Sequence, residues 1–327
     1  MLVIGIDVAK AKLDVCVLLD ERKRAKVVAN SNAGVIQLLA WLQQHWPEQP
    51  LSQMHAVLEG TGVYHESAAC ALFDVGVHVS IVNPAQVRDF AEGLGIRTKT
   101  DGVDSQVLAR YGAWVQPAPW TPPPAHVRTL TALLARREAI AQDLRRERNR
   151  QEKALAAQSV ALVRHSLETS IAFLLQQLKD IERQIDQHID GHPDLKGDVR
   201  LLQSIPAVGD KVGTQMTSLL RSHCFTTAEQ LAAYLGLVPV ERQSGSSVCA
   251  KARLSKAGPA TMRATLYMAA VVATRHNPHI KALYERLLAK GKSKMAAIGA
   301  AMRKLVHLCF GVWKHQCPYQ ADFVQRA

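Results

Sequence analysis

A proline-rich stretch near the middle of the chain constrains the fold more than any other feature. Residues 116–126 read "QPAPWTPPPAH" and contain five prolines without hydrophobic periodicity. Proline lacks a backbone N–H and stiffens the chain, so a helix or a central strand does not run through such a segment. The stretch therefore predicts a stiff linker and a domain boundary, and the patterns on its two sides differ.

Before the linker, strand signals alternate with helix signals. Apolar, β-branched runs mark the strands, and apolar residues at helical spacing mark the helices. Their order predicts an α/β layered domain with a mixed sheet. The expected strands are residues 2–9, 12–20, 26–30, 54–60 and 77–82, and the expected helices are residues 32–46, 63–76, 84–92 and 101–114.

After the linker the signals are mostly helical. Residues 127–157 form a long charged helical pattern, and a second helix carries an apolar seam with alternating spacings of four and three. This seam predicts a helical hairpin or coiled-coil arm, which could pack within the chain or join two chains. The last domain is mostly helical, with loops expected at 205–213, 236–258 and 290–295. The predicted domains are residues 1–118, 119–196 and 197–327. The seam consists of Leu167, Ile171, Leu174, Leu178, Ile181 and Ile185.

Composition excludes several classes of protein. Hydrophobic residues make up 48% of the chain, which is too many for a disordered tail. No uninterrupted apolar run reaches the roughly 18 residues that span a bilayer. The apolar start "MLVIGIDVAK" lacks a basic leader and predicts a strand, with no signal peptide. The six scattered cysteines predict reduced thiols in a cytosol. We therefore expect a cytoplasmic protein without a membrane partner.

The net charge of +12 is concentrated in the last third of the chain. Residues 201–327 hold 17 Lys and Arg against 5 Asp and Glu, whereas residues 1–120 hold 10 against 12. A basic domain attached to a slightly acidic one is typical of a protein that binds a polyanion, and nucleic acid is the usual one.

Four carboxylates in the first domain follow a pattern that suits metal binding. Asp7 lies inside an apolar strand, where a carboxylate is costly unless it is paired or holds a cation. Glu59 ends another strand, and Asp101 and Asp104 begin a helix with i, i+3 spacing. Oxygen ligands of this kind suit Mg²⁺ or Mn²⁺. Two such ions can activate the attacking oxygen and stabilise the leaving oxygen in phosphodiester chemistry.

Each of these residues also has an ordinary structural explanation. Asp7 could pair with Lys10 or Lys12, Glu59 could be a surface strand end, and Asp101 could cap a helix. The four together, in this order along the chain, favour the metal site.

Several motifs resemble those of the DEDD-type insertion-sequence transposases. They are "GIDVAKAKLDV", "LEGTGVYHE", "VNPAQVRDFAEGLGIRTKTDGVDS", "SIPAVGDKVG", "AAYLGLVPVERQSGSS" and "RLSKAGPATMRATLYMAA", and together they cover nearly the whole chain. This family includes the Piv-type pilin-gene invertases and the bridge-RNA-guided recombinases. The resemblance implies an RNase H-like, RuvC-like first domain whose acidic positions fall on Asp7, Glu59, Asp101 and Asp104.

The resemblance also implies a serine nucleophile at Ser244, in "RQSGSS", with Ser246 and Ser247 as alternatives. A flexible, small-residue loop lets a backbone approach a phosphate closely. A serine needs activation, which the resemblance assigns to the metal site of the same or another protomer. By itself, the serine could equally be part of a solvent loop. Basic residues that could bind nucleic acid surround this loop or lie upstream of it: Arg242, Lys251, Arg253, Lys256, Arg263 and Lys211.

The segment "LLQSIPAVGDKVGTQMTSLL" resembles a helix-hairpin-helix, which offers backbone N–H groups to a phosphate. The usual pattern has glycine where this chain has Ala207. The alternative is an ordinary connection between two helices.

The expected function is that of a DNA transposase or site-specific recombinase, which cuts and rejoins strands through a covalent phosphoserine link. The resemblance implies donor and target DNA, a bridge RNA as guide, a prokaryotic cytosol or nucleoid, and a dimer or tetramer joined through the coiled coil. Three alternatives remain at this stage. They are a RuvC-like junction nuclease without a covalent intermediate, a nucleic-acid-binding scaffold with a degenerate acidic site, and a sugar-kinase-like ATPase, because "GIDVAK" also resembles the first strand of that fold.

Overall fold

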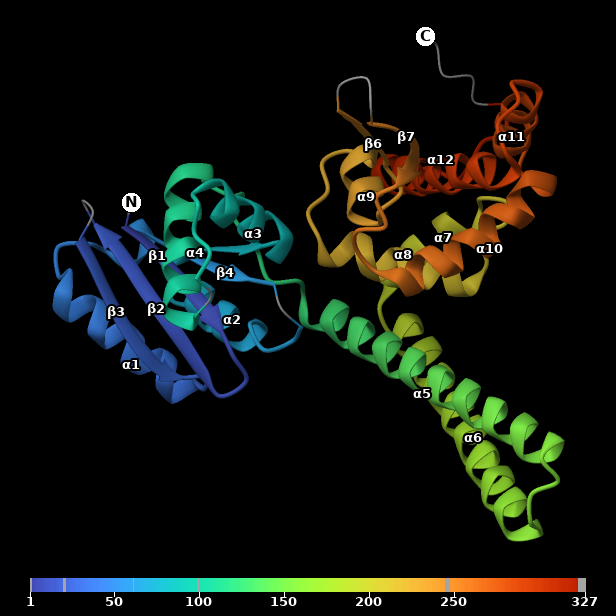
Figure 1. Cartoon of the computed structure of the whole chain (residues 1–327), viewed down its shortest axis with the longest axis horizontal. Helices are drawn as coiled ribbons and strands as arrows, with labels where there is room; N and C mark the ends of the chain where they lie inside the picture. Colours follow the sequence, from blue (N-terminus) through green and yellow to red (C-terminus); the bar gives the residue numbers. More distant parts are fainter. Residues whose placement is uncertain (1, 20–21, 61, 99, 245–247, 323–327) are drawn as a thin grey trace. The chain divides into compact units, whose positions relative to one another are not determined.

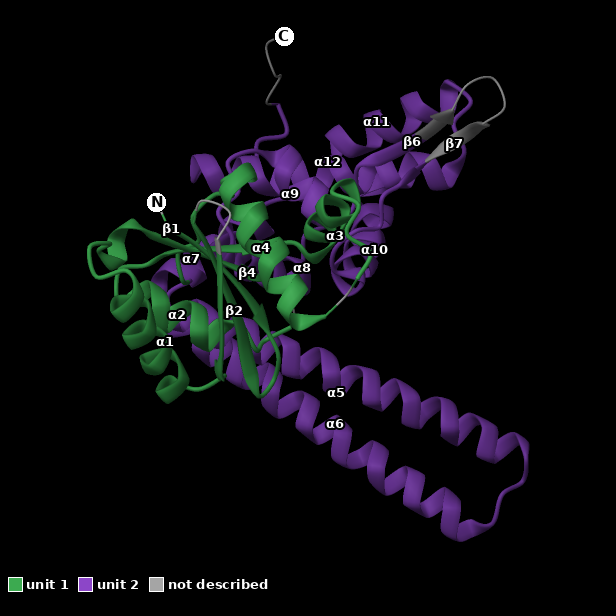
Figure 2. Cartoon of the chain, turned by 60° about the vertical axis from the view of Figure 1, so that its left-hand side comes forward, with its two compact units in different colours: residues 1–122 green, residues 123–327 purple. Residues whose placement is uncertain are grey.

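The computed structural model in Figure 1 describes residues 2–19, 22–60, 62–98, 100–244 and 248–322. The side chains of residues 22, 242–244 and 248–252 lie outside this description. The chain forms two compact units, residues 1–122 and 123–327 (Figure 2).

A five-stranded mixed sheet with the order β3-β2-β1-β4-β5 forms the centre of the N-terminal unit. β2 pairs antiparallel with both β1 and β3, whereas β4 pairs parallel with β1 and β5. Three antiparallel strands followed by two parallel ones form the mixed sheet that the sequence patterns predicted, and this order agrees with the RNase H-like fold that the resemblance implies. The strands are β1 (Leu2–Val8), β2 (Lys12–Leu19), β3 (Arg22–Ala29), β4 (Met54–Glu59) and β5 (His78–Val82).

Different helices cover the two faces of this sheet. One face packs with α1 and α2 in a core that includes Ile4, Ile6 and Leu38. The other face packs with α3 and α4 in a smaller core around Val57 and Leu108. The helices are α1 (Asn32–His45), α2 (Glu66–Asp74), α3 (Pro84–Gly93) and α4 (Asp101–Val115).

Gly5 lets α4 lie unusually close to β1. A Cβ atom at this position would lie 2.0 Å from the carbonyl oxygen of Ser105 and 2.3 Å from the backbone nitrogen of Ala109. These are backbone atoms of α4, so only glycine fits without a shift of the helix. The contact brings the first turn of α4 to the end of β1, where Asp7 lies.

Two elements differ in length from the prediction. β3 starts at residue 22 instead of 26, because the charged residues before Lys26 still pair in register with β2. Charged side chains are common on an edge strand, which hides this strand from a hydrophobic pattern. α2 starts at Glu66 instead of Val63.

The first part of the proline-rich stretch packs against the N-terminal unit. Trp120 joins the larger core and meets Phe73 edge to face at 6.4 Å between ring centroids. Its backbone N–H donates to Val79 O at 2.7 Å. Ser80 Oγ donates to Ala118 O at 2.8 Å and lies 2.8 Å from His55 Nε2. Residues 117–120 are thus fixed along β5.

The C-terminal unit begins with a helical hairpin, which we call the arm. α5 (Ala125–Ala156) and α6 (Ala161–Asp190) lie side by side in both views (Figures 1 and 2). The predicted seam faces α5, with Ile181 and Ile185 buried and Leu174 and Leu178 partly buried in the shared core. The seam therefore packs within the chain.

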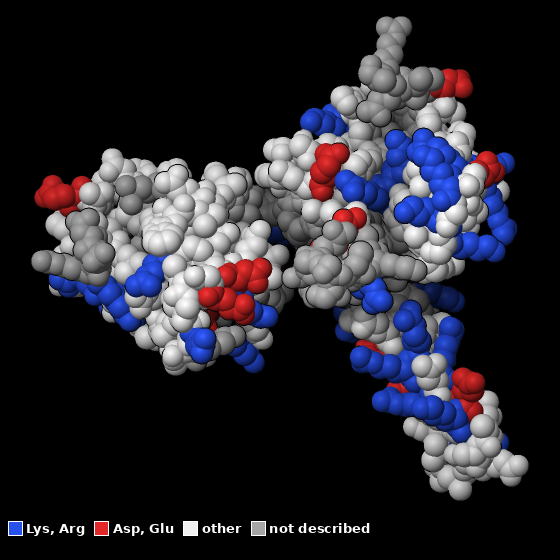
Figure 3. Space-filling view, turned by 45° about the horizontal axis from the view of Figure 1, so that its top comes forward, with Lys and Arg blue, Asp and Glu red and all other residues white. Residues whose placement is uncertain are grey.

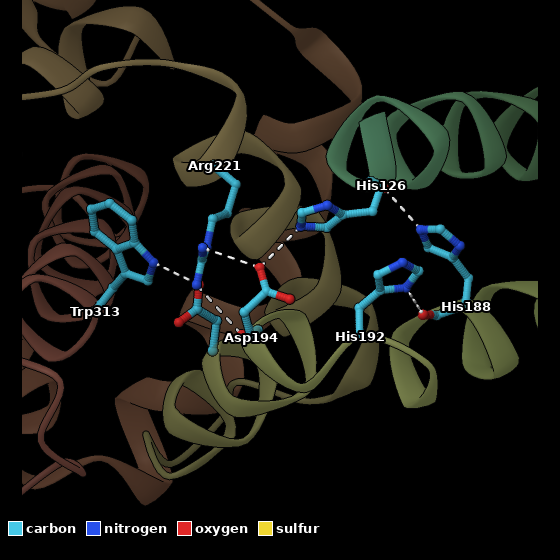
Figure 4. Close-up of polar contacts among 7 residues, drawn as sticks. His126, His188, His192, Asp194, Arg221 and Trp313 are labelled. Atoms are coloured by element: carbon cyan, nitrogen blue, oxygen red, sulfur yellow. Dashed lines mark hydrogen bonds and ion pairs between the residues drawn. The ribbon is translucent and has the colours of Figure 1, made fainter. Parts of the chain in front are cut away.

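A polar cluster at the root of the arm joins α5 and α6 to the rest of the unit (Figure 4). His126 Nε2 lies 3.0 Å from Asp194 Oδ2, and the His126 and His192 rings stack at 4.9 Å. Asp198 is 1% exposed and accepts hydrogen bonds from Arg221 Nε at 2.6 Å and from Trp313 Nε1 at 2.8 Å. We call this set the arm-root cluster.

Six further helices in the described part, together with one hairpin of strands, complete the C-terminal unit. The longest helix of its body, α12, is apolar and long enough to cross a membrane by length and composition, but 44% of its apolar window is buried inside the unit. Residues such as Leu305 and Cys309 lie in the main core, which explains this composition. Besides α5 and α6, the helices are α7 (Pro193–Gln203), α8 (Asp210–Ser222), α9 (Ala228–Tyr234), α10 (Ala260–His276), α11 (Pro278–Ala289) and α12 (Lys294–His315).

The expectation of a plain loop over residues 236–258 was wrong. β6 (Pro239–Ser244) and β7 (Val248–Leu254) pair antiparallel as a two-stranded sheet. The strands are polar, and so their pairing was masked in a hydrophobic pattern. At the base of the hairpin, a Cβ atom on Gly258 would lie 1.9 Å from Tyr234 O, so this close backbone crossing requires glycine.

Candidate metal centre and nucleic-acid interface

The strand register places three carboxylates on the face of the sheet that α4 covers. Asp7 on β1 lies directly opposite Asp14 on β2. Ile6 pairs with Leu58 on β4, so Glu59 follows beside Asp7 on the parallel neighbour. Because side chains alternate between faces along a strand, all three share the face of Val3, Val57 and α4.

The first turn of α4 adds two more carboxylates. Thr100 is the N-cap, and its hydroxyl accepts the hydrogen bond from the Val103 N–H. Asp101 is therefore the first helical residue and not the cap, which corrects that alternative. Asp101 and Asp104 lie in the positive first turn of the helix, which stabilises acidic side chains. The close contact at Gly5 carries this turn over the end of β1.

The carboxylates around Asp7 expose it to an excess of negative charge. Burial raises the pKa of Asp7 from 3.8 to about 6, and the carboxylates of Asp104, Asp101, Glu59 and Asp14 add to the rise in that order. Ligand oxygens of Asp7, Asp14 and Asp101 all lie within 4.8 Å of one another. Like charges at such distances favour a cation between them.

A lysine supplies one positive charge at this centre. Lys12 Nζ donates to Asp101 Oδ2 at 2.7 Å and lies 3.0 Å from Asp14 Oδ2. The hydrogen bond to Asp101, followed by the Asp14 carboxylate, raises the pKa of Lys12, and the same bond lowers the pKa of Asp101. Lys12 thus pairs with Asp14 and Asp101, and not with Asp7 as one alternative suggested.

The structure brings the four predicted carboxylates to one region and adds Asp14. Glu59 and Asp104 are close enough to raise the pKa of Asp7, although the tightest group of oxygens is that of Asp7, Asp14 and Asp101. The sequence analysis missed Asp14 as a site residue. Its signal was a polar residue within an apolar strand of a short hairpin, at a spacing that pairs it with Asp7.

The donor set suits a hard divalent cation. The centre offers carboxylate oxygens from two adjacent strands and a helix start, and Asp14 Oδ2 is buried beside the Lys12 amine. Such oxygen-rich sites match the preference of Mg²⁺ and Mn²⁺. Residues Asp7, Glu59, Asp101 and Asp104 are thus a chemically consistent set for the predicted metal.

The predicted serine lies at the end of a strand. Ser244 is the last residue of β6, and its backbone pairs with Val248 of β7. Its side chain lies outside the described atoms, as do the alternatives Ser246 and Ser247 in all their atoms. The described structure therefore places the Ser244 backbone at the end of β6, opposite Val248.

The basic residues predicted to contact nucleic acid differ in exposure and in their contacts within the protein. Arg253, Lys256 and Lys211 are exposed. Arg263 instead donates from one terminal nitrogen to the carbonyl oxygens of Ala257 and Gly258, both at 2.9 Å, at the base of the β6–β7 hairpin. The side chains of Arg242 and Lys251 lie outside the described atoms.

The two units differ in surface charge, as they differ in the charge of their sequences. Figure 3 shows Lys and Arg gathered on one face of the C-terminal unit and along the arm, and a compact acidic patch on the N-terminal unit.

The connection between α7 and α8 has the backbone shape that glycine usually supplies. Ala207 has φ of +81°, in the left-handed region, although it carries a side chain. Gly209 is the N-cap of α8 and provides no side-chain cap, so the first N–H groups of α8 have no side-chain acceptor at that position.

Comparison with known proteins adds direct evidence of relationship. The profile described as "Transposase IS116/IS110/IS902 family" matches residues 199–285, and a DEDD-type IS110 transposase profile matches residues 4–158. The chain is 34% identical to the pilin gene-inverting proteins of Moraxella lacunata and Moraxella bovis, over 97% of each chain. A solved structure of T. thermophilus RuvC in complex with a Holliday junction substrate aligns at 18% identity with a TM-score of 0.27, over 37% of this chain and 99% of the other.

Proposed function

The chain belongs to the IS110 family of DEDD-type transposases and site-specific recombinases, and from this premise we propose how its residues cut and rejoin DNA strands. The observation that carries the proposal is the convergence of Asp7, Glu59, Asp101 and Asp104 on one face of the sheet, where burial, followed by the charges of the neighbouring carboxylates, raises the pKa of Asp7 to about 6. Carboxylates gathered this closely around a half-buried one are costly for a purely structural role.

We propose that these four carboxylates bind Mg²⁺ or Mn²⁺. When bound, the divalent cation lowers the pKa of an attacking hydroxyl and offsets charge on the phosphate oxygens. The protein contributes the ligand geometry: two strands fix Asp7 and Glu59, and the α4 start aims Asp101 and Asp104 toward Asp7. Asp7, with its raised pKa, gives up its proton more readily once a cation is present.

Ser244 is the proposed nucleophile. Its Oγ attacks a DNA phosphorus and loses its proton, and the bond from that phosphorus to the 3′ oxygen breaks. The products are a phosphoserine ester and a free 3′-hydroxyl. A 3′-hydroxyl of the recombining strand then attacks the ester, which forms the new phosphodiester and returns the serine hydroxyl. The position of Ser244 at the very end of β6 supports access of this residue to a backbone phosphate.

The C-terminal unit is the proposed nucleic-acid interface. Arg253, Lys256 and Lys211 offer exposed positive charge, and Arg263 holds the base of the β6–β7 hairpin in place. The uncapped N-terminus of α8 is suited to a phosphate contact of the helix-hairpin-helix type. Such contacts position a backbone without reading its sequence. We further propose that the C-terminal unit binds donor and target DNA sites together with a bridge RNA that acts as guide. We also propose that the protein acts in the cytoplasm as a homo-oligomer joined through the arm.

The deciding experiment compares Ser244→Ala with Ser246→Ala, a matched control two positions along the chain. Purified protein is incubated with DNA carrying the element's ends, and protein–DNA adducts are separated under denaturing conditions. We expect Ser244→Ala to lose both the adduct and strand exchange while it retains nucleic-acid binding. An adduct that persists in Ser244→Ala would overturn the serine assignment.

The same assay separates the alternative functions. If the protein is a junction nuclease, the wild type will cleave DNA without forming an adduct. If it is a scaffold, the wild type will show no Mg²⁺-dependent cleavage, and Asp104→Asn will therefore have nothing to remove. ATP hydrolysis by the wild type would support the kinase-like alternative. Sequencing of RNA that co-purifies with the protein, followed by recombination with and without that RNA, tests the guide.

A further inference from the structure

Asp14 lies in the acidic centre but is not one of the four family positions. It is 7% exposed, and its Oδ2 is buried. Lys12 Nζ forms an ion pair with this oxygen at 3.0 Å, and the same amine donates to Asp101 at 2.7 Å. One lysine shared by two carboxylates offsets the cost of burying Asp14 only in part, so this position requires a further explanation.

The geometry around Asp14 points to a cation. Its carboxylate lies across the β1–β2 ladder from Asp7, and the ligand oxygens of both residues fall within 4.8 Å of an Asp101 oxygen. The only positive group in the described contacts of these three residues is Lys12, which bridges Asp14 and Asp101. A cation therefore already occupies the space between two of the carboxylates.

We propose that Asp14 is a fifth carboxylate of the metal centre, and that the Lys12 amine is an internal counter-ion which the divalent cation displaces. The inference rests on the metal site proposed above. Before metal binding, Lys12 offsets part of the repulsion and holds Asp101 in place. When the divalent cation binds, Asp101 and Asp14 turn from the amine to the metal, and the amine moves toward solvent, where 43% of the Lys12 side chain is already exposed.

The opposing explanation is that Asp14 serves only to hold Lys12. In that case Asp14 affects the metal solely through the lysine. The two explanations differ in the sign of the effect at Lys12. A competing cation weakens metal binding, so its removal strengthens binding; a positioning residue supports metal binding, so its removal weakens binding.

The experiment measures Mn²⁺ affinity of the full-length protein by titration calorimetry, without DNA. The variants are Asp14→Asn, Lys12→Met, the double variant and Asp7→Asn, with Asp74→Asn as a control for an exposed carboxylate elsewhere in the same unit. Asparagine and methionine retain the shapes of the original side chains, which protects the β1–β2 hairpin.

We expect Asp14→Asn to weaken Mn²⁺ binding by about tenfold, and Lys12→Met to strengthen it several-fold. In the double variant, the loss of Asp14 should still weaken binding relative to Lys12→Met alone. Unchanged affinity in Asp14→Asn, weaker binding in Lys12→Met, or no effect of Asp14 in the Lys12→Met background would each overturn the inference. If Asp7→Asn also leaves Mn²⁺ affinity unchanged, the proposed metal site itself fails.

Discussion

The acidic centre of the N-terminal unit and the arm-root cluster use similar side chains but balance their charges differently. In the arm-root cluster, buried Asp198 accepts hydrogen bonds from Arg221 and Trp313, and His126 and Arg221 contact Asp194. In the acidic centre, Lys12 contacts two of the carboxylates, Asp14 and Asp101, and the neighbouring carboxylates add to the rise that burial causes in the pKa of Asp7. A charge that the fold itself neutralises stabilises the structure, whereas a charge left for an external partner indicates function.

The largest effect that sharpens this comparison is expected at Asp7. Asp7→Asn should lower strand cleavage by roughly three orders of magnitude, because metal ligands supply several kcal/mol of transition-state stabilisation. The same variant should raise the melting temperature of the metal-free protein, since it removes a repelled charge. Single-turnover cleavage assays and thermal unfolding with a chelator test both parts, with Asp74→Asn as the control. A lower melting temperature would show that contacts within the fold already neutralise the Asp7 carboxylate, which would contradict the comparison.

At the arm root, the expected effect is on stability. Asp198→Ala should destabilise the protein by about 3 kcal/mol, because it removes the acceptor of the Trp313 Nε1 donor and the buried partner charge of Arg221. Urea unfolding followed by circular dichroism measures this change. Asp186→Ala, at an exposed position on α6, is the matched control and should change stability little. A change at Asp198 no larger than that of the control would remove the contrast between the two regions.

The smallest expected effect is a difference in pH dependence between the two regions. The pKa of Asp7 is raised from 3.8 to about 6 in the folded, metal-free protein, so its contribution to stability is full below about pH 4 and is lost as pH rises through about 6. For Asp194, burial acts to raise the pKa, but the His126 hydrogen bond and other contacts lower it overall. Its contribution is therefore present above about pH 4 and is lost as pH falls further.

Melting curves of Asp7→Asn and Asp194→Asn against the wild type, from pH 3 to pH 8 with a chelator, measure these slopes. The gain from Asp7→Asn should grow between about pH 4 and pH 6 and then level off. The loss from Asp194→Asn should be largest near neutral pH and should shrink in acid. Parallel slopes for the two variants would contradict the comparison.

Sequence patterns predicted the N-terminal unit well because its elements are apolar and periodic. The runs that became β1, β4 and α4 carry strong hydrophobic signals, and the convergence of Asp7 with Asp101 follows from their order. The β6–β7 hairpin was missed because strands such as "PVERQS" are rich in polar residues and pair only with each other. A pattern of burial cannot reveal a strand that buries little.

The role of Asp14 illustrates a second limit. A single residue in a strand gives no information about its neighbour until the register is known, and a shift by one position reverses the face of every side chain. The arm-root cluster joins residues far apart in the chain, such as Asp198 and Trp313, which no local pattern relates.

Because Asp7 and Asp14 must lie opposite each other, the number of residues between them in the first hairpin is fixed. Six residues separate the two aspartates, and only residues 9–11 of these lie outside the strands. Substitutions in this turn leave the ladder intact, whereas insertion of one residue would send one of the two carboxylates into the apolar core. The residues of this turn can therefore change, whereas their number cannot. Two aspartates separated by six residues are thus a sequence signature by which the centre can be recognised in distant relatives.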